Sequence, residues 1–140
     1  MAEFRRPETA FAAPRQRRGK PTKNPDHLAW LRTLPCAVAA DGLCNKAMEA
    51  AHIRYTDRKA GKLDVGMGER PSDHWAIPLC SYHHRLSDNA QHSQNEWTWW
   101  TAHNIDPVKL AMALYLASGN DELGAVIILA TGTRNHENFT

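Results

Sequence analysis

The chain has 140 residues, enough for one domain with a modest core, and its composition is ordinary for a globular protein apart from five tryptophans. No apolar run is long enough to cross a bilayer, and the N-terminus lacks the apolar segment of a signal peptide. Three cysteines cannot all pair with one another, and small cytosolic domains rarely depend on disulfides, so metal ligation is the better expectation for clustered Cys and His. We therefore expect a soluble protein of a reducing cytoplasm, with no membrane partner.

Positive charge is concentrated at the N-terminus. The first 24 residues hold seven Lys and Arg against two Glu, whereas the whole chain carries a net charge of +2. Because this segment also has three prolines and little apolar periodicity, we predict a disordered basic tail over residues 1–24. Such cations displace counterions from phosphate, so a nucleic-acid-binding arm is one interpretation. A solubilising tail is the other, and the residues leave both open.

The first predicted element is a short amphipathic helix over residues 25–34, which Asn24 can cap. Alternation of apolar and polar positions predicts a strand over 48–55, and a second strand over 75–79 returns toward it. The polar loop between them, 56–71, is long for a compact domain, which indicates a functional or mobile segment.

The second half of the chain is predicted to be mainly helical. A short helix is expected to open at Cys80, and another to start near His92. The clearest helix covers 108–116, because Asp106 can cap it and Leu, Ala and Tyr residues form a buried stripe. The last apolar stretch, 125–130, fits either a strand or part of a helix. These elements together predict an α+β fold.

Three tryptophans lie close together, at positions 97, 99 and 100. Their spacing lines one face of a helix, so we expect them to form part of the core and not a platform for stacking nucleic-acid bases.

Four potential zinc ligands occur in two short motifs. Cys36 and Cys44 lie on either side of a turn, and Cys80 precedes His83 by three positions. Zinc prefers tetrahedral sulfur and nitrogen ligands, so these four residues predict a complete Cys3His site. The separation of the first two cysteines is longer than in most zinc knuckles, and the alternative is that the cysteines are simply buried.

A longer pattern runs from residue 49 to residue 100, and most of its histidines lie in 49–92. It reads Glu-Ala-Ala-His-Ile-Arg, then a Gly-rich loop with Pro-Ser-Asp, then Pro-Leu-Cys-Ser-Tyr-His-His-Arg, and downstream Gln-His-Ser-Gln-Asn-Glu before a Trp-Trp pair. This pattern resembles the HNH endonucleases, and more narrowly the phage and prophage group that includes the RecA-dependent recombination-enhancement nuclease. The resemblance covers roughly residues 26–117.

The resemblance implies a ββα-metal (His-Me) finger, in which two strands and a helix hold one divalent ion against the scissile phosphate. It implies that His52, at the end of the first strand, is the general base. It also implies that His84 and His92 bind a catalytic divalent cation, Mg2+ or another, while the Cys3His group holds a structural zinc that pins the finger. The nuclease domain would span residues 25–118, followed by a C-terminal extension over 119–140.

The chemistry of the side chains agrees with these roles. A neutral imidazole titrates near physiological pH and can take a proton from water. Arg54 and Arg85 are candidate phosphate clamps, because a guanidinium group can bind two phosphate oxygens at once. Asp73 stands near the position where the family has its Asn, and we expect it to orient the base or the metal.

The function predicted from the sequence is a metal-dependent DNA endonuclease that hydrolyses phosphodiester bonds in the cytoplasm of a bacterium or a phage-infected host. Its expected partners are DNA and, through the resemblance, a recombinase filament. No Asn lies between His52 and His84, and Ala51 stands where relatives often have an acid. These departures favour an alternative, a non-catalytic zinc-stabilised module that binds nucleic acid. A third hypothesis is a purely structural zinc domain for protein partners.

Overall fold

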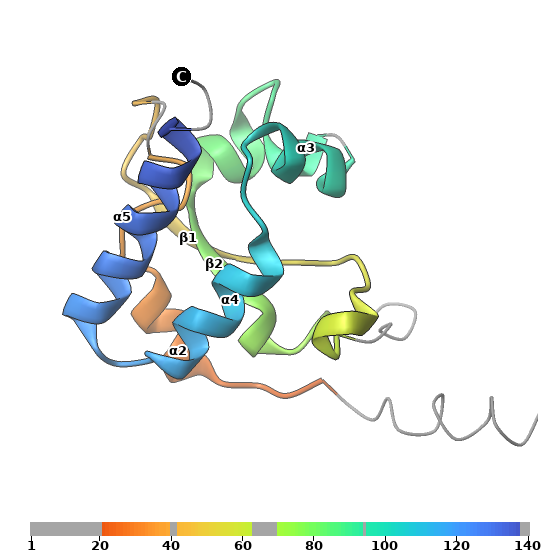
Figure 1. The fold of residues 1–140 in the computed structure, drawn as a ribbon, viewed down its shortest axis with the longest axis vertical. Coiled ribbons are helices and arrows are strands. Elements are labelled where there is room, and N and C mark those ends of the chain that lie inside the picture. The colour runs from red at the N-terminus through yellow and green to blue at the C-terminus, as the bar shows by residue number, and fades with distance from the viewer. Residues whose placement is uncertain (1–20, 40–41, 63–69, 94, 138–140) are drawn as a thin grey trace, which may run out of the picture.

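The computed structural model describes residues 21–39, 42–62, 70–93 and 95–137. Most of the predicted basic tail, residues 1–20, lies outside these ranges, as do residues 63–69 of the Gly-rich loop. The described part is a mixed α+β structure with one small two-stranded sheet (Figure 1). In chain order its elements are α2 (Pro25–Leu31), β1 (Met48–His52), η2 (Arg58–Ala60), η3 (Asp73–Trp75), β2 (Ala76–Cys80), η4 (Tyr82–Leu86), η5 (Gln91–Ser93), α3 (Glu96–Ala102), α4 (Pro107–Leu116) and α5 (Asp121–Glu137).

The sheet consists of β1 and β2 in antiparallel pairing, with Met48 opposite Cys80 and His52 opposite Ala76. Pro78 lies in the middle of β2. It is tolerated there because its carbonyl points away from β1, where it accepts a hydrogen bond from Ala37 N (2.9 Å). The N and C=O of one strand residue point the same way, so the missing N–H removes no bond to β1.

Both strands end differently from the prediction. The expected strand over 48–55 stops at His52, because its partner Ala76 is the first residue of β2 and the residues before Ala76 form η3. Ile53 N still donates to Trp75 O (2.8 Å), and Arg54 N points away from β2, to Glu96 Oε1 (3.0 Å). The expected helix start at Cys80 is also wrong, since Cys80 pairs with Met48 as the last residue of β2. The helical segment that follows, η4, is one wide turn of π-helix.

The helix caps agree with the sequence. The Asn24 side chain accepts from His27 N at the start of α2, and Asp106 accepts from Val108 N and Lys109 N at the start of α4. However, α2 ends at Leu31, three residues earlier than predicted, because the following amides form tighter i to i+3 bonds that close the helix as a 3-10 turn. The stretch 125–130, left open between strand and helix, is part of α5.

The core lies between the sheet and the helices. In Figure 1, α4 crosses the sheet with α5 beside it. Helix α5 meets α2 closely: a Cβ added at Gly124 would come within 2.7 Å of the Trp30 ring, which is held by a hydrogen bond from Nε1 to Asp121 Oδ1 (2.9 Å). The predicted C-terminal extension is therefore packed on the same core as the rest of the described chain.

The prediction that the three tryptophans form part of the core is correct for Trp99 and Trp100 and wrong for Trp97. Trp99 and Trp100 are buried, at 2% and 1% exposure, but Trp97 is 63% exposed. Successive helix residues point about 100° apart, so Trp97 lies about 200° around the helix from Trp99 and cannot share its buried face.

The end of the predicted tail is fixed to the body of the protein. Thr22 N donates to Ser72 Oγ (2.8 Å), Thr22 O accepts from Asp73 N (2.8 Å), and Asn24 N donates to Asp73 Oδ2 (2.8 Å). The expected disorder up to residue 24 is therefore wrong for Thr22 to Asn24.

Among the helices that the structure describes, none is both long enough and apolar enough to cross a membrane.

Candidate metal centre and active site

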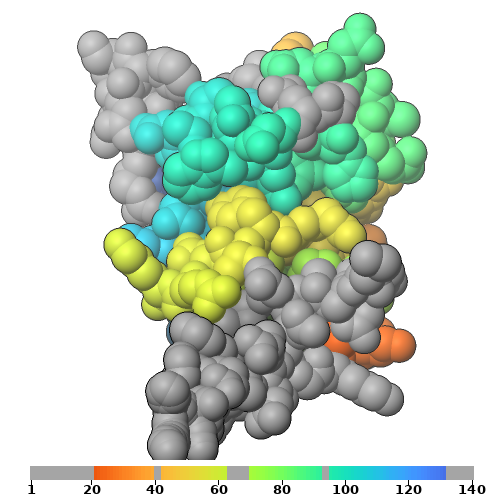
Figure 2. Space-filling view, turned by 90° about the vertical axis from the view of Figure 1, so that its right-hand side faces the viewer, coloured from red at the N-terminus to blue at the C-terminus, as the bar shows by residue number. Residues whose placement is uncertain are grey.

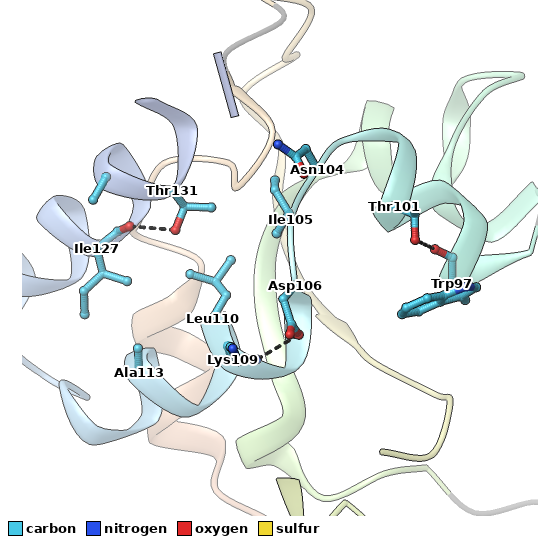
Figure 3. A pocket seen from close by; sticks show the side chains of 11 residues that line it. Trp97, Thr101, Asn104, Ile105, Asp106, Lys109, Leu110, Ala113, Ile127 and Thr131 are labelled. Carbon is cyan, nitrogen blue, oxygen red and sulfur yellow. Dashed lines mark hydrogen bonds between the residues drawn. The ribbon is translucent and has the colours of Figure 1, made fainter. Parts of the chain in front are cut away.

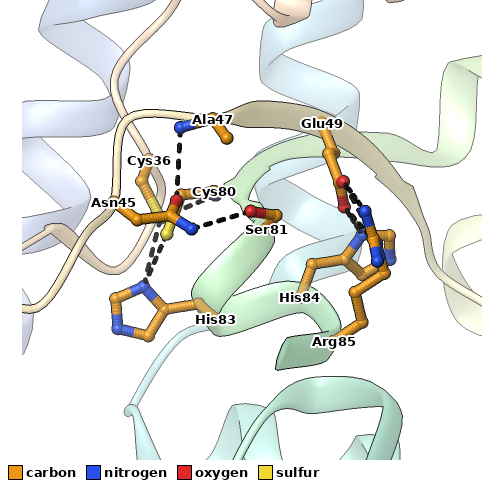
Figure 4. Close-up of polar contacts among 9 residues, drawn as sticks. All are labelled: Cys36, Asn45, Ala47, Glu49, Cys80, Ser81, His83, His84 and Arg85. Atoms are coloured by element: carbon orange, nitrogen blue, oxygen red, sulfur yellow. Dashed lines mark hydrogen bonds and ion pairs between the residues drawn. The ribbon is translucent and has the colours of Figure 1, made fainter. Parts of the chain in front are cut away.

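A compact cluster of sulfur and nitrogen atoms lies at one end of the sheet (Figure 4). Cys36 comes from the segment after α2, Cys44 from the segment before β1, Cys80 from the end of β2 and His83 from η4. One ligand atom of each lies within 4.8 Å of all the others. The cluster is the Cys3His group that the sequence predicted.

The spacing of these atoms fits a tetrahedral ion. The Nδ1 atom of His83 lies 3.2 Å from Cys80 Sγ and 3.7 Å from both Cys36 Sγ and Cys44 Sγ. Zinc bonds of about 2.1–2.3 Å in tetrahedral geometry place neighbouring ligand atoms about 3.6 Å apart. The donor set and its dimensions therefore suit zinc, with the four ligands held on three separate backbone segments.

The pKa values of the three thiols show that the thiolate forms need a nearby positive charge. Burial raises the pKa of Cys36 to about 11, and burial together with the adjacent thiols raises that of Cys44. Burial also opposes ionisation of Cys80, but hydrogen bonds from the backbone N–H groups of His83 and Asn45 outweigh it and lower its pKa to about 7. Three thiolates in this space repel one another, so a bound dication is what would make them stable together.

A histidine and a carboxylate are paired beyond the far end of β1. His52, the last residue of the strand, lies with its Nε2 2.8 Å from Asp73 Oδ1, and the Asp73 side chain is buried. Burial lowers the pKa of His52, although the Asp73 carboxylate opposes this shift. Burial disfavours the charged form of Asp73 as well, yet bonds from Asn24 N and His52 lower its pKa below the ordinary range. Asp73 is thus an anion bonded to a neutral imidazole near pH 7, in the place where the sequence predicted an orienting group.

A second histidine pair lies at the other end of β1. The Nδ1 of His84 is 2.7 Å from Glu49 Oε1, and the rings of His84 and His92 meet edge to face with centroids 4.3 Å apart. His84 turns toward β1, the strand that also carries His52, and its partner there is Glu49. His92 reaches the same place from η5, so two histidines predicted as metal ligands do come together.

Glu49 also holds Arg85. Its Oε2 lies 2.7 Å from Arg85 Nη2 and 3.1 Å from Nε, and this charge-assisted pairing, followed by the bond to His84, lowers the pKa of Glu49 (Figure 4). Sequence reasoning did not single out Glu49. The sequence could have predicted its role from two features. Alternation along β1 puts Glu49 on the opposite face from His52, and antiparallel pairing brings it close to the segment after Cys80.

Arg85 and Arg54, the two candidate phosphate clamps, differ in the charged groups that surround them. Arg85 is half exposed, with its guanidinium already paired to Glu49. Arg54 is exposed and lies close enough to His52 and His92 that its charge helps to lower the pKa of each, after the larger effect of burial. The charge of Arg54 therefore acts on a histidine of each group.

Comparison of the chain with protein-family models, with curated proteins and with solved structures gave no match in any of the three.

Proposed function

We propose that this protein is a metal-dependent DNA endonuclease of the HNH type, with a zinc-stabilised ββα-metal finger formed by β1, β2 and η4. The observation that carries the proposal is the partly buried His52–Asp73 pair at 2.8 Å, because it gives a strand-end imidazole the setting of a general base. The pairing of His84 with His92 is the second support.

His52 would take the proton from the attacking water. A carboxylate at Nε2 keeps the imidazole proton on that nitrogen, so the lone pair that accepts a proton is on Nδ1. Because burial lowers its pKa, His52 is neutral at physiological pH and available as a base. Asp73 would also stabilise the imidazolium that forms after proton transfer.

His84 and His92 would hold the catalytic divalent cation, and Glu49 would orient His84. Imidazole nitrogen is a suitable donor for Mn2+ and related ions, and the contact of Glu49 with His84 Nδ1 leaves His84 Nε2 as the donor toward the ion. When bound, the ion would neutralise charge on the phosphate and on the departing 3′ oxygen. Arg54 and Arg85 would grip the phosphate oxygens, with Glu49 fixing the direction of the Arg85 guanidinium.

The test is cleavage of supercoiled plasmid by purified protein across a panel of divalent ions, with and without a recombinase filament. Wild type is compared with His52→Ala, which should lose cleavage and keep its zinc, and with His103→Asn as a control histidine in the turn after α3. Cleavage at the wild-type rate by His52→Ala would refute the proposal.

The second candidate is a zinc-stabilised module that binds nucleic acid without chemistry. It is favoured by Ala51, which is 1% exposed and offers no side-chain donor beside the candidate base. It predicts salt-sensitive DNA binding and no cleavage with any divalent ion. A third candidate, a structural zinc domain for protein partners, would be favoured by failure to bind DNA at low salt.

A further inference from the structure

A cavity of about 700 Å3 lies between α3, α4 and α5, away from the zinc ligands (Figure 3). Its walls combine an aromatic ring, apolar side chains and a few polar groups, and its size is within the range of small-molecule sites, about 300–1,000 Å3. The residues that matter here are Trp97 and Thr101 on α3, Asn104 and Ile105 in the connection, and Lys109 on α4.

Trp97 is the unusual feature of this cavity. Large aromatic side chains contribute most when buried, and Trp99 and Trp100 on the same helix are buried, yet Trp97 is 63% exposed. Its ring is nevertheless held in place, because it meets the Tyr55 ring nearly at right angles with centroids 5.9 Å apart. A large aromatic surface fixed at the edge of a cavity is suited to stacking against a planar ligand.

The polar groups of the cavity are suited to a nucleotide. Lys109 provides a cation for a phosphate, and the Asn104 side chain has both a donor and an acceptor for a base edge. Asp106, the one acidic group among the lining residues, is engaged in capping α4 through Val108 N and Lys109 N. The Asp106 carboxylate thus has partners within the protein, and Lys109 is the one cation among the lining residues.

The cavity is linked to the candidate active site through one residue. Glu96, next to Trp97, accepts a hydrogen bond from Arg54 N (3.0 Å), and Arg54 follows His52 by two positions. Figure 2 shows the segment 50–62 lying against the segment 95–105 on one face of the molecule. A strand whose phosphate reached Arg54 would therefore have a neighbouring nucleotide close to Trp97.

We infer that this cavity binds an unstacked nucleobase of a single-stranded or locally opened DNA strand, with Trp97 as the stacking surface and Lys109 on the adjoining phosphate. The inference rests on the proposed function and adds a preference to it: a strand with accessible bases is bound better than a closed duplex. Sequence-tolerant stacking on an aromatic ring is the usual way in which single strands are held.

The test is the affinity of full-length protein for fluorescent oligothymidylate, measured by anisotropy without added divalent ion. Trp97→Ala should weaken binding roughly 5- to 150-fold, the range for one base stacked on an aromatic ring. Trp97→Phe should retain most of the affinity, and Leu116→Ala, at an 89% exposed position on α4, should retain all of it. Lys109→Gln should lower the slope of log K against log salt by about 0.7, as expected for one lost phosphate contact to a single strand.

An abasic strand of the same length separates stacking from charge. Wild type should bind it more weakly than oligothymidylate, and Trp97→Ala should bind the two alike. Equal affinity of wild type for both strands, an unchanged affinity of Trp97→Ala, or no binding at all would overturn the inference. Zinc content and melting temperature confirm that each variant is folded.

The outcome is independent of cleavage. Plasmid cleavage that depends on His52, together with unchanged strand binding by Trp97→Ala, would refute this cavity as a base site and leave the nuclease proposal standing. Base-dependent binding through Trp97 without cleavage in any ion would support the cavity and refute the nuclease.

Discussion

Asp73→Asn should move the imidazole proton of His52 from Nε2 to Nδ1, which is the tautomer that cannot act as the base. Asp73 Oδ2 accepts from Asn24 N and Oδ1 contacts His52 Nε2, each at 2.8 Å. In the amide, the oxygen must remain on the Asn24 side, because Asn24 N is a fixed donor. The new NH2 group then faces His52 Nε2 and makes that nitrogen an acceptor. The imidazole proton moves to Nδ1, and the lone pair needed for catalysis is lost.

The size of the effect follows from the role of the pair. General-base catalysis contributes about 10²- to 10⁴-fold, so single-turnover cleavage should slow by that factor while the melting temperature changes little. The carboxylate raises the pKa of His52 against the larger effect of burial, so its removal lowers this pKa further and moves the acidic limb of the pH–rate profile to lower pH.

Two measurements examine this reasoning separately. Cleavage rates from pH 5 to 9 report the base, with Asp57→Asn, a carboxylate that caps η2, as the matched control. Nitrogen chemical shifts of labelled imidazole report the tautomer even without cleavage. The reasoning would be refuted by an Asp73→Asn protein in which His52 keeps its proton on Nε2 and cleavage proceeds at the wild-type rate.

Three further outcomes are expected. Cys36→Ser should bind less than one zinc per chain and melt about 10 °C lower or more, by metal analysis and calorimetry; full zinc occupancy would contradict the Cys3His site. Glu49→Gln should weaken Mn2+ binding about 10- to 100-fold by titration calorimetry, because it loosens His84, with zinc unchanged; equal Mn2+ affinity would remove Glu49 from the site. His27→Leu should flatten the pH dependence of stability by up to about 1.4 kcal/mol per pH unit between pH 5 and 6.5 in urea unfolding, and an unchanged slope would count against it.

The sign of the His27 effect follows from its burial. The ring is 1% exposed, with Nδ1 2.7 Å from Ser118 Oγ, and burial lowers its pKa despite the nearby Asp73 charge. The unfolded chain therefore takes up this proton more readily than the folded one. The contribution of His27 to stability is complete above its unfolded pKa of about 6.5 and is lost as the pH falls toward the lower folded value.

Features with short-range signals could be predicted from the sequence. The start of α4 depends on Asp106 capping its own next two residues, which any chain segment can do alone. The Cys3His group could also be predicted, because the requirement for four tetrahedral donors limits the choice of residues. The His52–Asp73 contact was anticipated through the family resemblance, and its geometry needed the structure.

Features decided by distant partners could not be predicted. The length of β1 depends on its partner: Ala76, opposite His52, is the first residue of β2, and η3 precedes it. Pro78 occupies the centre of a strand because Ala37 approaches its free carbonyl. The exposure of Trp97 depends on where α3 lies against the core, since helical periodicity gives the angle between side chains and not the face that is covered.

The attachment of the N-terminal segment to Asp73 determines where one of its positive charges lies. Thr22 and Asn24 are hydrogen-bonded to the loop that carries the partner of His52, so Lys23, which lies between them in the chain, is held next to that loop. For the proposed nuclease, the Asp73 carboxylate that orients the base would also hold the end of the basic segment in place.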